Sequence, residues 1–311
     1  MAGRRQDSRR DGGVTNMNHV LLIFLDGIGI GKRDEHNPLA QIPDVAPLAV
    51  FQNEEPEIPF AGVLARTDAC LGVEGRPQSA SGQTTILTGV NAPQKLGRHK
   101  QGFPNQALRD IINEHSIFLQ LKSLGITPNT FANGYTPLFF AKTPRWKSAT
   151  TVAMEAAEMR FRDWEDLLND RALFHDFTNS VLLAYNAPAI ALRTPEEAGK
   201  ILADIVTENR FTLYEYFITD KIGHDQDLAL AQKVLPELAA FVRAAVENVD
   251  LKNTTVIMTS DHGNIEDLSK RNHTLNEVAT IVWGREAKET AARIRSLADI
   301  TPAIVNLLQN D

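Results

Sequence analysis

Apolar runs that end in polar turns are the feature that most constrains the fold of this chain. Five of them are strand candidates: His19 to Leu25, Ile126 to Ala132, Leu213 to Ile218, Thr255 to Thr259 and Val278 to Val282. Short apolar runs bounded by turn residues are typical of buried strands, although Pro128 makes the second run less regular. The sequence therefore predicts a sheet that is covered on both faces.

Helical patterns lie between several of these runs. The candidates are Ala107 to Leu124, Pro195 to Thr207 and Leu228 to Val249, the last with a repeating apolar face that Pro236 interrupts. Alternating strands and helices predict an α/β fold, a three-layer sandwich with a mostly parallel central sheet. The alternation weakens between residues 134 and 191, so this segment is expected to form at most a small cap within one domain of residues 17–311.

Charge and segment composition limit the partners of the chain. Its net charge of -7 provides no overall positive field for nucleic acid or an anionic membrane. No apolar run is long enough to cross a membrane. The polar, basic residues 1–16 predict a disordered tail rather than a secretory signal, because no apolar segment follows them. Together with the single cysteine, Cys70, this favours a cytoplasmic location.

Two carboxylates follow strand candidates, where an open parallel sheet places its ligands. Asp26 ends the first apolar run and begins a glycine-rich turn. Asp220 follows another run, and His224 comes four residues later. On a helix this spacing puts both side chains on one face, whereas Gly223 also permits a tight loop. Either motif alone is explained more simply as an ordinary turn or helix start.

A third motif is more specific. Ser260-Asp261-His262-Gly263-Asn264 follows a strand candidate, and His273 comes eleven residues after His262. Adjacent aspartate and histidine side chains can converge in a turn, and Gly263 favours one. A polar pair at the end of a strand has no packing role. Carboxylate oxygen with imidazole nitrogen suits Mn, Zn or Fe better than Ca, so the motif favours a metal site.

Ser79 is the candidate nucleophile. It lies in a small-residue loop, Gln78 to Thr85, that leads into the apolar residues Ile86 and Leu87. A loop that leads into a helix would direct backbone N–H groups and the helix dipole at a phosphate, although an ordinary helix N-cap explains the same residues. Arg98 and Lys100 are candidates for binding a substrate phosphate or carboxylate, and both also suit a solvated surface.

In this order along the chain, the motifs resemble those of the alkaline phosphatase superfamily, and within it the cofactor-independent phosphoglycerate mutase and phosphopentomutase branch. The resemblance rests on Asp26-Gly27, a serine in an S-x-x-G loop at Ser79, Asp220 with His224, Asp261-His262-Gly263-Asn264 and His273-Thr274. It spans Asp26 to His273 and therefore most of the chain. Five motifs in one order are far more specific than any one of them.

The resemblance implies a site for two divalent metal ions, Mn or Zn in the first place and Mg as an option. One ion would be held by Asp220, His224 and His273, and the other by Asp26, Asp261, His262 and the Ser79 oxygen. Ser79 would attack a small phosphorylated metabolite to form a phosphoserine. The phosphoryl group would then pass to water, as in a hydrolase, or to another hydroxyl of the substrate, as in a mutase.

The chain also departs from this branch. About 140 residues separate Ser79 from Asp220, which leaves little room for the large inserted domain of phosphoglycerate mutases. Gln83 stands where the mutases usually have histidine, and Gln78 where they have Asn or Asp. The substrate, the acceptor and the oligomeric state stay open. Two alternatives are a phosphodiester, phosphonate or sulfate ester hydrolase, although the sulfatase pattern C/S-x-P-x-R is missing, and a binding protein that has lost turnover.

Overall fold

The computed structural model describes residues 17–142, 146–184 and 190–310, so the predicted basic tail lies outside the described residues. Its centre is a six-stranded sheet in the order β2-β6-β5-β1-β4-β3. The strands are β1 His19–Leu25, β2 Val63–Thr67, β3 Asn129–Phe131, β4 Phe211–Tyr216, β5 Thr254–Thr259 and β6 Val278–Gly284. Neighbouring strands from β5 to β3 are parallel, whereas β6 is antiparallel to β5 and to β2. The predicted α/β class with a mostly parallel sheet is confirmed.

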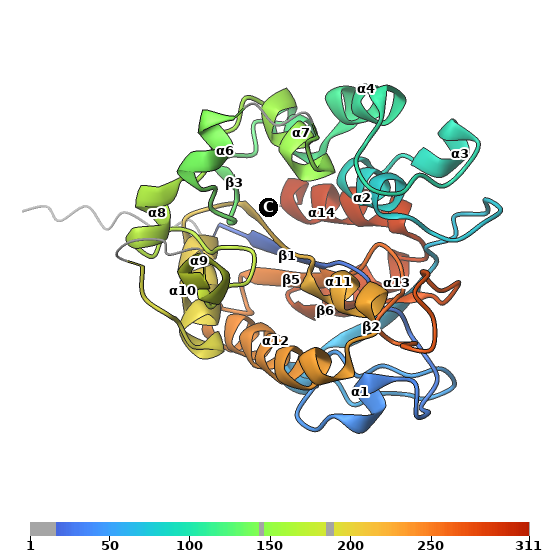
Figure 1. The fold of residues 1–311 in the computed structure, drawn as a ribbon. Helices are drawn as coiled ribbons and strands as arrows, with labels where there is room; N and C mark the ends of the chain where they lie inside the picture. The colour runs from blue at the N-terminus through green and yellow to red at the C-terminus, as the bar shows by residue number, and fades with distance from the viewer. Residues whose placement is uncertain (1–16, 143–145, 185–189, 311) are drawn as a thin grey trace, which may run out of the picture.

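Helices cover both faces of this sheet (Figure 1). They are α1 Pro38–Gln41, α2 Ser79–Thr88, α3 Ala92–Leu96, α4 Gln106–His115, α5 Ile117–Ser123, α6 Pro137–Ala141, α7 Ala149–Ala156, α8 Trp164–Leu168, α9 Ser180–Ala184, α10 Pro195–Thr207, α11 Ile218–Asp225, α12 Leu228–Asn248, α13 Ala287–Arg293 and α14 Ile300–Gln309, with short 3-10 helices at Pro59–Ala61 and Leu297–Asp299. In the described part of the chain, no helix combines the length and apolar character needed to cross a membrane.

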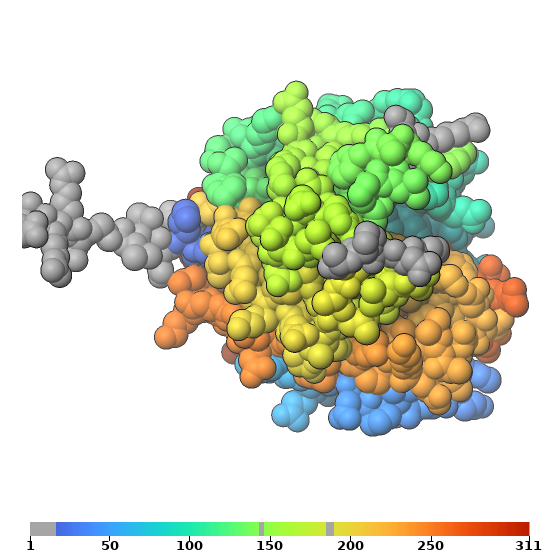
Figure 2. Space-filling view, turned by 60° about the vertical axis from the view of Figure 1, so that its left-hand side comes forward, coloured from blue at the N-terminus to red at the C-terminus, as the bar shows by residue number. Residues whose placement is uncertain are grey.

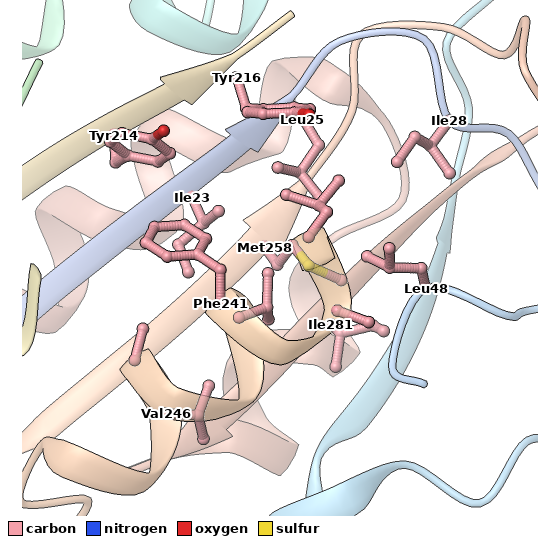
Figure 3. Close-up of a cluster of buried hydrophobic side chains, with 14 of the residues drawn as sticks. Ile23, Leu25, Ile28, Leu48, Tyr214, Tyr216, Phe241, Val246, Met258 and Ile281 are labelled. Carbon is pink, nitrogen blue, oxygen red and sulfur yellow. The ribbon is translucent and has the colours of Figure 1, made fainter. Parts of the chain in front are cut away.

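The alternation of side chains along β1 explains the three layers. Leu21, Ile23 and Leu25 pack into the cluster formed with α10 and α12, part of which Figure 3 shows. Their neighbours Leu22 and Phe24 point to the opposite face, in the cluster that includes α7 and α14. Because both faces of the strand are buried, apolar and polar residues do not alternate along it. The run is apolar throughout.

The structure confirms two predicted helices and divides the third. α10 has the predicted bounds, and α12 ends one residue before the predicted end and continues through Pro236. The helix expected from Ala107 to Leu124 is two helices, because Ser116 adopts an extended backbone (ψ 145) between α4 and α5. The strand β2 was not predicted: it is short, carries Arg66 and is only partly buried, so its sequence lacks a strand-like apolar run.

The segment 134–191, expected to form at most a small cap, contains the short helices α6 to α9. Leu167, Ala172, Leu182 and Ile190 form a small hydrophobic cluster separate from the two large ones. Figure 2 shows the green to yellow-green residues of this segment at the surface, next to the yellow and orange residues of α10 and α12. Whether the segment acts as a cap stays a prediction.

Candidate active site

The first group of predicted ligands lies at the carboxyl ends of two neighbouring parallel strands. Asp26 follows β1, and Asp261 and His262 follow β5 after a single residue. All three side chains are buried. The Nε2 atom of His262 lies 3.3 Å from Asp26 Oδ1 and 3.5 Å from Asp261 Oδ2. We call Asp26, Asp261 and His262 the inner cluster.

The second group comes from the next strand and a later loop. Asp220 and His224 lie one turn apart on α11, so the helical interpretation of their spacing is correct. His224 Nε2 is 3.3 Å from Asp220 Oδ2, and His273 Nε2 is 3.4 Å from Asp220 Oδ1. The two Nε2 atoms are 3.1 Å apart. We call Asp220, His224 and His273 the outer cluster.

Backbone carbonyls fix the orientation of both outer imidazoles. The Nδ1 atom of His224 lies 2.6 Å from the carbonyl of Arg271, and that of His273 lies 2.8 Å from the carbonyl of Pro77. A carbonyl can only accept, so each Nδ1 donates and each Nε2 keeps its lone pair. Both Nε2 atoms lie beside Asp220. This orientation by a second partner is typical of metal-binding histidines.

Ser79 lies where the two clusters meet. Its Oγ is 3.0 Å from His262 Nε2, and the ring of His262 stacks on that of His273 with centroids 3.6 Å apart. The structure corrects the prediction of a loop here, because Ser79 is the first residue of α2. The positive end of the helix dipole is therefore beside the serine hydroxyl, which favours a bound anion.

The helix α2 could not be recognised from periodicity, because it is buried on nearly every side. Three of its threonines donate to backbone carbonyls one turn earlier: Thr84 to Ala80, Thr85 to Ser81 and Thr88 to Thr84. These bonds satisfy the hydroxyls inside the core. Small and polar residues therefore take the place of the usual apolar stripe.

The inner cluster is short of positive charge. Burial raises the pKa of Asp26 well above its usual range, and the charge of Asp261 raises it further. Burial and then the charge of Asp220 raise the pKa of Asp261 to about 7. Burial and the neighbouring His273 lower the pKa of His262 to about 3, so this imidazole is neutral at pH 7.

The outer cluster has the opposite balance. Burial raises the pKa of Asp220, but hydrogen bonds from His273 and Asn264 outweigh burial and lower it to about 2. Burial lowers the pKa of His273, but its hydrogen bond and ion pair with Asp220 outweigh burial and leave the pKa raised. Asp220 is therefore ionised whether or not a cation is bound.

The arrangement fits divalent metal ions. Donor atoms of Asp26, Asp261 and His262 lie within 4.8 Å of one another, as do those of Asp220, His262 and His273. In the described part of the chain, the buried Oδ1 atoms of Asp26 and Asp261 have no hydrogen-bond partner. Buried carboxylate oxygens without a partner, beside neutral imidazole nitrogens, are suited to a cation such as Mn or Zn.

Glu266 holds the loops of the site together and was missed in the sequence. This buried carboxylate accepts hydrogen bonds from the backbone N–H groups of Gly29 (2.9 Å) and Asn264 (2.7 Å). It also accepts from the side chains of Thr274 (2.5 Å) and Asn276 (3.0 Å). It therefore connects the turns that carry Asp26, Asp261 and His273. Its only sequence signal is its place two residues after Asn264.

Two further contacts position the ligands. Asn264 donates to Asp220 Oδ1 at 2.6 Å, and Gln83 donates to Asp26 Oδ2 at 3.2 Å. Gly27 has a positive φ of 77°, and a Cβ there would lie 2.8 Å from Asp220 Cα. Only glycine lets the turn after β1 approach α11 this closely.

A cavity of about 550 Å³ lies over these groups. We call it the large cavity. Ser79, Asp26, Asp220 and His224 form one side of it. The other side carries six ring-bearing residues, which we call the aromatic wall: Phe103, Phe131, Tyr135, Phe174, His175 and Phe217. Several of them come from the weakly patterned part of the chain.

The predicted substrate residues lie outside this lining. Neither Arg98 nor Lys100 is among the described residues that line the cavity. Lys100 donates its backbone N–H to Ser81 Oγ at 3.0 Å, while its ammonium group donates to the carbonyl of Gln101. Arg98 is exposed in the turn after α3. Their role in substrate binding stays a prediction.

A second cavity, of about 410 Å³, lies next to His273. Lys32, Arg76 and Lys270 are among its lining residues, together with Glu266 and Asp267. Lys270 pairs with Asp267 at 2.9 Å. Ser79 does not line this cavity, so it is not the path by which a phosphate ester would reach the serine.

Comparison with known proteins agrees with the site. Residues 190–311 match the family described as Metalloenzyme superfamily. This region contains Asp220, His224, Asp261, His262 and His273, whereas Asp26 and Ser79 lie outside it. The fold therefore brings Asp26 and Ser79, from the unmatched part of the chain, to the predicted ligands of the matched region.

Curated relatives are distant and longer than the matched region. A 2,3-bisphosphoglycerate-independent phosphoglycerate mutase of Desulforudis audaxviator is 28% identical over 124 residues, 37% of this chain and 24% of the mutase. One of Pseudomonas entomophila is 26% identical over 185 residues, 57% of this chain and 34% of the mutase. The matched part of this chain thus spans about a quarter to a third of these enzymes.

Two solved structures share the fold. A protein of Pyrococcus horikoshii superposes with a TM-score of 0.53 at 14% identity, covering 95% of this chain and 98% of that one. A cold-active alkaline phosphatase of Shewanella sp. superposes with a TM-score of 0.52 at 12% identity, covering 93% and 99%. The predicted resemblance is confirmed: residues 190–311 match the metalloenzyme superfamily model, and the chain has an alkaline phosphatase-like fold.

Proposed function

We propose that this chain is a metal-dependent phosphotransferase that uses Ser79 as its nucleophile and acts on a small phosphate monoester. The observation that carries the proposal is the position of Ser79. Its hydroxyl lies 3.0 Å from His262, at the start of α2 and on the lining of the large cavity. A nucleophile, an anion-binding helix end and two clusters of metal-binding side chains therefore meet at one point.

The inner cluster would hold one divalent ion together with the Ser79 oxygen, and the outer cluster would hold a second. Such ions, when bound, neutralise charge on the transferring phosphoryl group and lower the pKa of a nearby hydroxyl. Glu266, Asn264 and Gln83 keep the carboxylates in place through the hydrogen bonds described above. Backbone N–H groups in the first turn of α2 would hold the phosphate oxygens, which would leave the phosphorus facing Ser79 Oγ.

The two half-reactions balance without any further reactant. Ser79 Oγ forms a bond to phosphorus as the ester oxygen leaves, and the serine proton ends on the released alcohol. Water then attacks the phosphoserine and returns the serine hydroxyl and phosphate, or a second hydroxyl of the substrate takes the phosphoryl group instead. Tyr135, Phe174 and His175 are supplied by the segment 134–191, which we propose limits the access of water as a small cap.

The first test combines metal content with phosphate release from p-nitrophenyl phosphate. We expect about two Mn or Zn ions per chain, the number that a two-metal phosphoryl-transfer site requires. Ser79→Ala should keep metal at the outer cluster but lose hydrolysis and phosphoenzyme, which rapid acid quenching would detect by mass. Ser123→Ala, an exposed serine on α5, is the matched control. Full turnover in Ser79→Ala would remove serine from this role.

A comparison of substrates distinguishes a phosphate monoesterase from a phosphodiester or sulfate ester hydrolase. Bis-p-nitrophenyl phosphate and p-nitrophenyl sulfate present the same leaving group on a diester and on a sulfate. We expect the monoester to be preferred, because the end of α2 and two cation sites suit a dianionic group. Metal binding with no turnover of any ester would favour the non-catalytic alternative. A cytoplasmic location, proposed from the single cysteine, is tested by cell fractionation.

A further inference from the structure

The aromatic wall presents apolar surface to the large cavity, and phosphoryl transfer at Ser79 does not need this surface. Phe103 and Phe217 are 47% and 42% exposed, although both line the cavity. The ring of Phe217 packs at a tilt of 30° against that of His175, with centroids 4.5 Å apart. Exposed aromatic rings gathered in one concave surface are typical of a site that binds an apolar or ring-shaped ligand.

The charged residues of the same lining indicate that the ligand carries no carboxylate. Among the described residues that line the cavity, Lys221 is the one lysine or arginine. Its ammonium group pairs with Asp225 at 2.6 Å and is largely exposed. Of the three lining carboxylates, Asp26 and Asp220 belong to the metal-binding clusters, and the third is Glu215. A carboxylate beside the phosphate would therefore find no arginine or lysine clamp in this lining.

Glu215 is the carboxylate that metal binding does not explain. It belongs to β4, is 8% exposed and shares the sheet face of Leu213. The side chain of Asn133 holds its backbone in place, accepting from the Glu215 N–H at 2.9 Å and donating to its carbonyl at 2.8 Å. Glu215 lines the cavity from this fixed backbone, and burial raises its pKa to about 7.

We propose that the large cavity binds the alcohol part of the phosphate ester, and that this part is an apolar, ring-bearing group without negative charge. The inference rests on the proposed role of Ser79, because a phosphate on that serine places the ester's organic group against the aromatic wall. Glu215 lines the same cavity, and in its ionised form its carboxylate repels an anionic substituent. Glycerate phosphates, which carry a carboxylate, are poor ligands for this cavity.

The second cavity provides the contrasting surface. It contains the cations Lys32 and Arg76, which would suit an anionic group, but Ser79 does not line it. If the substrate were an acidic sugar or glycerate phosphate, binding would depend on cations such as Arg76. Dependence on Phe217 instead identifies the aromatic wall as the binding surface.

The experiment measures binding with two ligands that cannot be hydrolysed, methylphosphonate and 1-naphthylmethylphosphonate, to the full chain loaded with Mn. Both carry the same phosphonate, so their affinity ratio reports the ring alone. We expect the naphthyl compound to bind at least about 10-fold more tightly, the gain for one ring contact of about 1.4 kcal/mol. Phe217→Ala should remove most of this gain, whereas Phe60→Ala should keep it.

Phe60 is a matched control because it is 41% exposed and does not line the cavity. A second comparison uses 3-phosphoglycerate with wild type, Glu215→Gln and Arg76→Ala. Weak binding of 3-phosphoglycerate that improves in Glu215→Gln supports the inference. Equal affinity for the two phosphonates, or tight 3-phosphoglycerate binding that is lost in Arg76→Ala, overturns it.

Turnover separates this inference from the proposed function. If wild type hydrolyses esters through Ser79 but prefers anionic alcohols and ignores the wall variants, the inference fails and the function stands. If the naphthyl group improves binding through Phe217 while no ester is turned over, the wall is a binding surface and the nucleophile proposal fails.

Discussion

The two sides of the large cavity are built in different ways. The side with the metal-binding clusters comes mainly from the segments that follow three adjacent strands, β4, β1 and β5, and His273 is added by a later loop. Glu266 and backbone carbonyls hold those turns in place. The aromatic wall comes from scattered segments around Phe103, Tyr135 and Phe174, and some of its rings remain exposed.

This difference suggests that the clusters carry out the reaction and that the aromatic wall selects the substrate. Groups that must meet within about 3 Å need rigid support, and the ends of packed parallel strands provide it. Groups that only select an organic substituent can lie on connecting segments, which tolerate change. We therefore expect substitutions in the clusters to affect turnover and those in the wall to affect substrate choice.

The largest expected effect is that of Asp261→Asn. Removing this buried carboxylate from the inner cluster should lower kcat/KM for p-nitrophenyl phosphate by about 1,000-fold or more, because it takes away charge that supports phosphoryl transfer. Metal content should fall by about one ion per chain. Asp110→Asn, an exposed aspartate on α4, should leave both values unchanged. Near-normal metal content and turnover in Asp261→Asn would break the contrast between the two sides.

Glu215 lines the cavity but belongs to neither the metal-binding clusters nor the aromatic wall. Its protonation can be tested by the pH dependence of stability in Glu215→Gln. The folded pKa of about 7 lies above the usual 4.5, so the folded state keeps a proton that the unfolded state has lost. The free energy of unfolding should therefore fall as pH rises from 4.5 through 7, by about 3 kcal/mol at pH 8. Glu215→Gln should lack this loss.

Urea unfolding of the chain at pH 5 and at pH 8 measures the difference. Glu247→Gln, on the exposed side of α12, is the control for removing one carboxylate. The same pH slope in wild type and Glu215→Gln would show that the buried carboxyl is not protonated in the folded protein.

Glu266→Gln should weaken metal binding by about 10- to 100-fold, as for other groups that support metal ligands. A glutamine offers one acceptor oxygen where Glu266 accepts from four donors, so the turns of Gly29 and Asn276 lose part of their connection. A calorimetric titration with Mn measures the affinity directly. If only the melting temperature falls and Mn affinity does not, Glu266 supports the fold alone.

The smallest expected effect is that of Phe103→Ala. This ring is half exposed at the edge of the cavity, so its loss should raise KM for 1-naphthyl phosphate by about 3-fold and leave kcat unchanged. Steady-state kinetics on naphthyl and methyl phosphates provide the comparison. A change in kcat of the same size for both substrates would instead assign Phe103 to the reaction itself.

Much of the fold was predictable because its signals are local. The bounds of β1 and α10 follow from a continuous apolar run and from a repeating apolar face. The turns after strands located Asp26, Asp220 and Asp261, because polar residues that follow a buried strand must reach the edge of the sheet. The spacing of Asp220 and His224 predicted a shared helix face once a helix was assumed.

Other features could not be predicted for physical reasons. The helix α2 has no amphipathic period because it is buried all round. The break at Ser116 and the strand β2 depend on packing that no local pattern records. Glu266 is one glutamate among many charged residues until the fold shows four donors around its carboxylate.

The sequence by itself determined the α/β class and the chemical character of the site, because periodicity and short motifs depend only on neighbours along the chain. The tertiary structure alone decided which of these residues meet. It placed Ser79 against His262, 183 residues away, and brought Ser79 and the aromatic wall to one cavity. Convergence of this kind depends on strand order and on the packing of distant segments, and neither is written in any local stretch of sequence.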